Sequence, residues 1–129
     1  MAEAPCRAIV LEDDPAIARL LETILVREGF TVRLAARRSE AIEQIGSDRF
    51  HLVVLDLIVP DHGIDVIEFI KHHQLDLLKA IVVITADPRV ITAMLRGEYP
   101  EPICKFLAKP FDVEQLTIAV HSCKQLCAE

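Results

Sequence analysis

Residues 52–56 read Leu-Val-Val-Leu-Asp, an uninterrupted apolar run that ends on a carboxylate. Such a run is typical of a strand that is buried on both faces of a parallel sheet. Three other apolar runs also lead to polar side chains, so that the candidate strand-end residues are Glu12, Asp13, Asp56, Thr85 and Lys109. Because the carboxyl ends of parallel strands lie on one edge of an open sheet, we expect these five side chains to converge.

The spacing of the apolar runs predicts an α/β fold. Runs of strand length alternate five times with segments of helical period, which is typical of a parallel sheet connected by helices. Right-handed crossovers place helices on both faces, and we predict a flavodoxin-like, five-stranded parallel sheet in the order 2-1-3-4-5. The expected strands are 8–11, 31–35, 52–56, 80–85 and 105–107.

Helix signals fill the intervals between these strands. Asp14 is a suitable N-cap for the first helix, Pro15 fits its first turn and Gly29 ends it. Ser39 is the expected cap of a short second helix. Further helices are expected through residues 66–70, 89–96 and 113–127.

Length and composition predict one domain with an aliphatic core. The chain has 129 residues, of which 52% are hydrophobic and only 5% aromatic. This length suits a single domain with one compact core over residues 1–129. The formal net charge of −6 argues against direct nucleic-acid binding, because phosphate contacts need a concentrated basic face.

The four cysteines are expected to be reduced, mostly buried thiols. No secretory signal precedes Cys6, which favours a cytoplasmic location, where disulfides are rare. Cys123 and Cys127 have a spacing compatible with soft-metal binding, but no further ligands are evident. No apolar stretch approaches the roughly 20 residues of a spanning helix, so we expect no membrane segment.

The acidic side chains indicate a metal-assisted phosphoryl acceptor. Glu12, Asp13 and Asp56 would repel one another unless a hard divalent cation bound between them, and Mg²⁺ suits an open site of oxygen ligands. Lys109 adds a second positive group, and the Thr85 hydroxyl can donate to a phosphate oxygen. Metal and ammonium together would offset the charge on a phosphoryl group transferred to Asp56.

Four blocks of this sequence resemble the receiver domains of bacterial two-component response regulators, of which the chemotaxis regulator is a single-domain member. These blocks are Ile-Val-Leu-Glu-Asp-Asp-Pro, Leu-Val-Val-Leu-Asp-Leu-Ile-Val-Pro, Val-Val-Ile-Thr-Ala and Phe-Leu-Ala-Lys-Pro-Phe. The resemblance covers nearly the whole chain and implies a phosphorylated signalling switch, not an enzyme.

The resemblance also implies a role for each residue. Asp56 would be the phosphoacceptor, and Glu12, Asp13 and the backbone carbonyl of Ile58 would complete a Mg²⁺ site. Thr85 would be the switch hydroxyl and Lys109 would pair with the phosphate, with a cis Lys109-Pro110 bond. Phe106 would be the aromatic switch residue. The expected partners are a histidine kinase or phosphotransfer protein and a downstream effector domain or protein, and a weak homodimer through the last two helices is left open.

Three departures from the family pattern stand out. The loop Pro60-Asp61-His62-Gly63 is one residue short, which puts the metal geometry in question. Residues 97–102 replace the expected small-residue turn on the partner-binding surface. Phe106 stands where Tyr is common and lacks a hydroxyl, so its switching would depend on burial.

Two other functions remain open. A degenerate receiver would bind proteins without being phosphorylated, and the two altered loops keep this alternative alive. An aspartyl-phosphate hydrolase would also place its nucleophile at a strand end, but it usually needs an acid two residues later, where this chain has Ile58.

Overall fold

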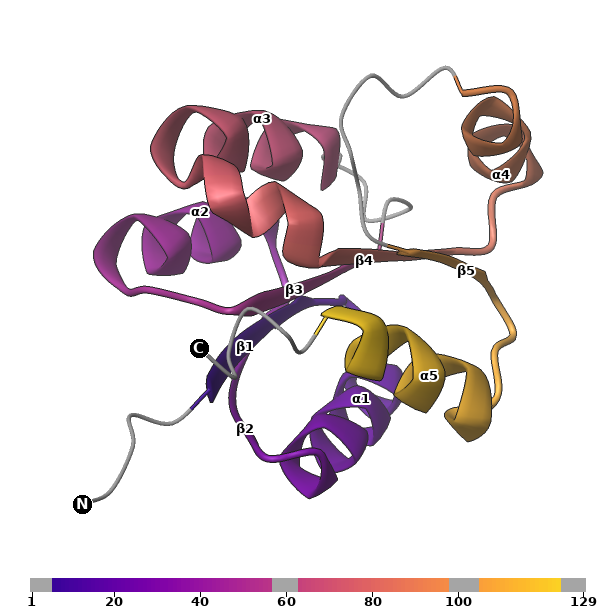
Figure 1. The fold of residues 1–129 in the computed structure, drawn as a ribbon, viewed down its shortest axis with the longest axis horizontal. Helices are drawn as coiled ribbons and strands as arrows, with labels where there is room; N and C mark the ends of the chain where they lie inside the picture. The colour runs from indigo at the N-terminus through magenta and orange to yellow at the C-terminus, as the bar shows by residue number, and fades with distance from the viewer. Residues whose placement is uncertain (1–5, 57–62, 98–104, 124–129) are drawn as a thin grey trace.

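The computed structural model describes residues 6–56, 63–97 and 105–123 (Figure 1). Strands alternate with helices along the chain, and one 3-10 helix, η1, precedes the fourth strand. The elements are β1 (Cys6–Leu11), α1 (Pro15–Arg27), β2 (Phe30–Ala35), α2 (Arg38–Ser47), β3 (Leu52–Asp56), α3 (Gly63–His73), η1 (Leu75–Ala80), β4 (Ile81–Thr85), α4 (Pro88–Leu95), β5 (Lys105–Ala108) and α5 (Val113–Cys123).

The five strands form one parallel sheet in the order β2-β1-β3-β4-β5, which confirms the predicted topology. The register aligns the strand ends: Leu11 pairs with Leu55, Asp56 with Ile84, and Thr85 with Ala108. Helices α1 and α5 cover one face, while α2, α3 and α4 lie on the other (Figure 1). The carboxyl ends of the strands therefore meet at one edge.

The core is aliphatic and centres on β1, β3 and β4. Every residue of β3 and β4 is buried, because these strands have neighbours on both sides and helices on both faces. Among the described residues, the buried polar or charged side chains are Glu12, Asp56 and Thr85. All three lie at the carboxyl edge, so the apolar interior is interrupted there.

Helix starts were predicted less well than strands. Asp14 caps α1 as predicted, since its Oδ1 accepts hydrogen bonds from the backbone N–H groups of Ala16 and Ile17 at 2.9 and 3.2 Å. The predicted Ser39 cap is wrong: α2 begins at Arg38, and its N-cap residue, Arg37, makes no side-chain capping hydrogen bond. The implied cis Lys109-Pro110 bond is confirmed.

The prediction of reduced thiols is also wrong for the described cysteines. Cys6 and Cys123 are both disulfide-bonded. The prediction used the expected compartment, and such an argument cannot show which sulfur atoms come within bonding distance in the fold. Cys104 and Cys127, with the soft-metal pattern that includes Cys127, lie outside the described residues.

None of the helices between residues 6 and 123 that the structure describes combines the length and apolar character needed to span a bilayer.

Candidate functional site

The predicted strand-end residues meet at the carboxyl edge of the sheet. Glu12 and Asp13 follow β1, Asp56 ends β3 and Thr85 ends β4. Lys109 follows β5, and its backbone N–H donates to the carbonyl oxygen of Thr85 at 2.7 Å. The parallel topology therefore brings together residues from four separate segments, as the sequence predicted.

Three carboxylates form a potential metal site. Ligand oxygens of Glu12, Asp13 and Asp56 all lie within 4.8 Å of one another. Glu12 and Asp56 are only 3% and 4% exposed, whereas Asp13 is open to solvent. A site whose ligands are all carboxylate oxygens suits a hard divalent cation. Because one of the carboxylates faces solvent, the cation could keep several of its bound water molecules.

Lys109 lies between the two buried acids. Its Nζ donates to Glu12 Oε1 at 2.8 Å and to Asp56 Oδ2 at 2.7 Å. The backbone N–H of Asp14 donates to the other oxygen of Glu12 at 3.2 Å. One ammonium group thus offsets part of the charge of two carboxylates that would otherwise repel each other.

Burial and charge shift the pKa values of this cluster. Burial raises the pKa of Glu12, and the nearby charge of Asp56 raises it further, although Lys109 and the Asp14 N–H act in the opposite direction. Burial alone would lower the pKa of Lys109, but its hydrogen bonds to Asp56 and Glu12 and their charges raise it above its ordinary value. Lys109 is therefore a permanent cation at neutral pH.

Thr85 connects this edge to α4. Its side chain is 1% exposed, and its Oγ1 accepts a hydrogen bond from the Asp87 N–H at 3.1 Å. The Asp87 carboxylate in turn accepts from the Arg89 N–H at 2.9 Å and forms an ion pair with the Arg89 guanidinium. Asp87 was not among the residues predicted from the sequence, yet Asp87-Pro88 repeats the Asp14-Pro15 signal that begins α1.

Comparison with known proteins identifies the family whose members share this fold. Residues 8–121 match the response regulator receiver domain family. The chain belongs to that family. The matches support receiver domains in general and not the chemotaxis regulator in particular.

Similar proteins include receivers of longer regulators. The DNA-binding transcriptional regulator NtrC of Azospirillum brasilense is 33% identical over 114 residues, which cover 88% of this chain and 23% of that protein. The chain spans less than half the length of three curated relatives that it matches, namely 23%, 47% and 35% of their lengths.

Solved receiver structures share the fold over nearly the whole length of this receiver. The response regulator TrrA of Thermotoga maritima, in complex with Mg²⁺ and BeF, has a TM-score of 0.77 and 25% identity, covering 92% of this chain and 98% of that one. The beryllofluoride-activated NtrC4 receiver domain dimer has a TM-score of 0.77 and 33% identity, covering 93% and 98% of the two chains.

Phe106 does not have the buried environment that was expected. It pairs with Val83 in the register of β5 and is 40% exposed. The reason is its position on an edge strand of the receiver sheet, where a side chain has neighbours on fewer sides. Its switch role stays a prediction, and Ile58 and the short loop after it lie outside the described residues.

Proposed function

We propose that this receiver domain is a phosphoacceptor in two-component signal transduction and that Asp56 receives the phosphoryl group. A carboxylate oxygen of Asp56 would attack the phosphorus of a phosphohistidine, the phosphorus–nitrogen bond would break, and the histidine would leave. The observation that carries this proposal is the cluster of three carboxylates within 4.8 Å, with Lys109 Nζ 2.7 Å from Asp56 Oδ2.

The carboxylates fit Mg²⁺, which would supply positive charge to the phosphoryl oxygens during transfer. We propose Glu12, Asp13 and Asp56 as its ligands, together with the backbone carbonyl of Ile58. Lys109 would hold a second phosphoryl oxygen, since it is already charged and directed at the acceptor. The similar receiver in complex with Mg²⁺ and BeF supports this assignment, because fluoroberyllate resembles a phosphoryl group.

We propose that Thr85 and Phe106 transmit phosphorylation to the surface of α4, β5 and α5. Thr85 would donate its hydroxyl hydrogen to a phosphoryl oxygen, which would bias an existing equilibrium between two conformations. Large apolar side chains are exposed on these elements, and Leu95 is 85% exposed. Such a surface suits an effector domain, an effector protein or a weak homodimer.

The remaining assignments follow from this role. The donor would be a histidine kinase or a phosphotransfer protein, the domain would extend over residues 1–129, and it would act as a switch and not as an enzyme. A cytoplasmic location is part of the proposal. The support for this location is the proposed phosphotransfer from a kinase. The expectation of reduced thiols no longer supports it, because Cys6 and Cys123 are disulfide-bonded.

Intact mass spectrometry after incubation with acetyl phosphate and Mg²⁺ tests the proposal. We expect the mass of one phosphoryl group to be added to the native chain and not to an Asp56→Ala variant. Asp76→Ala provides a control that removes an exposed aspartate of η1, away from the carboxyl edge. An unmodified native chain, or equal modification of the Asp56 variant, contradicts the proposal and favours the non-phosphorylated platform.

A further inference from the structure

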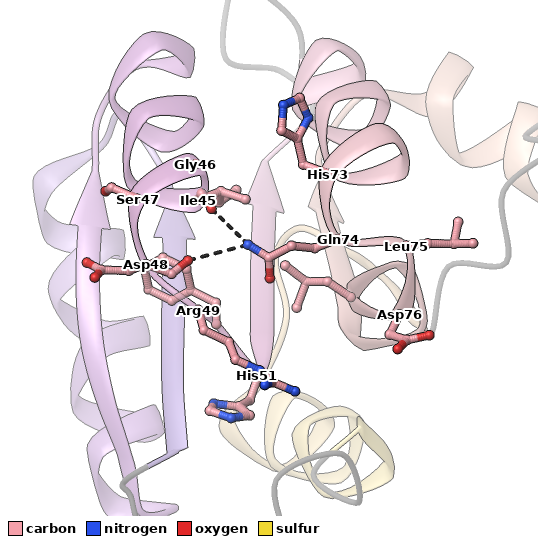
Figure 2. A pocket seen from close by; sticks show the side chains of 12 residues that line it. Ile45, Gly46, Ser47, Asp48, Arg49, His51, His73, Gln74, Leu75 and Asp76 are labelled. Carbon is pink, nitrogen blue, oxygen red and sulfur yellow. Dashed lines mark hydrogen bonds between the residues drawn. The ribbon is translucent and has the colours of Figure 1, made fainter.

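A cavity lies at the edge of the sheet opposite the carboxylate cluster. It has a volume of about 830 Å³ and is lined by residues 45–51, which lead from α2 into β3, and 73–77, which lead from α3 into η1 (Figure 2). Both segments precede strands, so the cavity is at the amino edge, whereas the carboxylate cluster is at the carboxyl edge. Its apolar floor includes Ile45, Phe50 and Leu77, all of which are buried.

A hydrogen-bonded glutamine holds the two walls of this cavity together. Gln74 Nε2 donates to the carbonyl oxygen of Ile45 at 2.8 Å and more weakly to that of Asp48 at 3.4 Å (Figure 2). His73 is fixed beside it, because its ring stacks on Phe69 with centroids 3.9 Å apart. The cavity is therefore preformed by contacts between α3 and the α2–β3 connection.

Hydrogen-bond donors gather at the β3 end of the cavity. His51 Nδ1 accepts the backbone N–H of Arg7 at 3.0 Å, so the neutral ring carries its hydrogen on Nε2 and can donate it to a ligand. The Arg49 guanidinium lies near this ring (Figure 2). The structure gives Arg49 no carboxylate partner within the described part of the chain.

The charges around His51 favour an anion. Burial lowers the pKa of His51, and the positive charges of Arg49 and Arg7 lower it further. The cavity is also lined by two carboxylates: Asp48, which pairs with Arg7 at 3.5 Å, and Asp76 on the side away from His51. An anionic group would therefore be attracted to the Arg49 and His51 end and repelled from the Asp76 end.

We propose that this cavity binds a small organic anion whose carboxylate or phosphate contacts Arg49 and His51 and whose apolar body lies on Phe50 and Leu77. The volume is within the range of small-molecule sites and is larger than a bare inorganic ion requires. A ligand in this cavity would not contact Asp56, because the two sites lie at opposite edges of the sheet.

NMR titration with phenyl phosphate and with benzoate, in the absence of Mg²⁺, tests this site. We expect saturable shifts in the His51 ring and in the amides of residues 45–51 and 73–77, and a higher His51 pKa in the bound state. The probe that saturates at the lower concentration identifies phosphate or carboxylate as the preferred group. Inorganic phosphate should bind several-fold more weakly than phenyl phosphate, because it cannot cover the apolar floor.

Three variants connect the titration to the proposed contacts. Arg49→Ala should weaken binding about tenfold or more, the effect of losing one charged hydrogen bond. Arg33→Ala, which removes an exposed arginine from β2, should leave binding unchanged, and Asp76→Asn should not weaken it. Equal binding by the Arg49 variant, shifts confined to Thr85 and Lys109, or shifts that rise without saturation would overturn the proposal.

Discussion

Lys109 holds Glu12 and Asp56 with a single ammonium group, and all three side chains are largely withdrawn from water. Each acid is stabilised as an anion by Lys109, while each destabilises the other by like charge. Removing the ammonium group would leave two buried carboxylates without their cation, which is more damaging than removing an exposed ion pair.

We therefore expect Lys109→Met to lower the free energy of unfolding by about 3 kcal/mol at neutral pH without Mg²⁺. Lys105→Met is the matched control, because Lys105 is an exposed lysine on the adjoining strand, β5. Urea denaturation of both variants measures the difference. Similar losses in the two variants would show that the contact with the acids contributes little.

The raised pKa of Glu12 predicts a specific dependence of stability on pH. Folding favours the protonated carboxyl, so the free energy of unfolding should fall as the pH rises from 4.5, its ordinary value, through the raised pKa of the folded protein. In Glu12→Gln, residue 12 does not titrate. Denaturation across this window, without Mg²⁺, should show the native chain losing stability relative to the variant, and parallel curves would refute the expectation.

At the scale of the secondary-structure elements, α4 is tied to the carboxyl edge through its first residues. The Thr85 hydroxyl accepts the Asp87 N–H, and the Asp87 carboxylate accepts the Arg89 N–H. Because Thr85 is also the proposed contact for the phosphoryl group, this short series of bonds connects the acceptor to the start of α4.

Asp87→Ala should accelerate hydrogen exchange at the first amides of α4, because the helix loses its capping acceptor. Amides of α1, which Asp14 caps, should be unaffected. Arg89→Ala is the control. It removes the exposed ion pair but keeps the backbone N–H of residue 89, which donates a hydrogen bond to the Asp87 carboxylate. Equal acceleration in the two variants would assign the effect to the ion pair instead.

The sheet was predictable because β1, β3 and β4 are buried on both faces, and such strands appear in a sequence as unbroken apolar runs. Local signals were less decisive. Ala80, predicted to begin a strand, ends the 3-10 helix η1 instead. The start of α2 at Arg38 shows that tertiary packing can set a helix boundary without a favourable cap.

The convergence of the site residues was predictable from topology, but their individual contacts were not. Parallel strands dictate that Glu12, Asp56 and Lys109 share one edge. The sequence could not show that Lys109 would contact both acids, since that depends on side-chain distances in the folded chain. It also could not show the cavity beside His51, which forms where two connections meet.

For the whole molecule, a bound cation should increase stability, because the three carboxylates come together only in the folded state. We expect Mg²⁺ at about 100 times its dissociation constant to add about 2.7 kcal/mol to the free energy of unfolding. Asp13→Asn should reduce this gain while preserving the contacts of Lys109, since Asp13 is the exposed member of the cluster.

Thermal or urea denaturation with and without Mg²⁺ measures the gain, and Ca²⁺ provides a comparison of cation size. An Asp13 variant that responds to Mg²⁺ as strongly as the native chain would place the ion elsewhere.

The bonds from Lys109 to Glu12 and Asp56 join residues that are 97 and 53 positions apart in the chain. During translation, both acids leave the ribosome long before the lysine does. A nascent or prematurely terminated polypeptide that ends before β5 has no ammonium group at its acceptor carboxylate. Under the proposed function, the acceptor site would therefore be complete only after synthesis has passed residue 109, and shorter products would lack its cation.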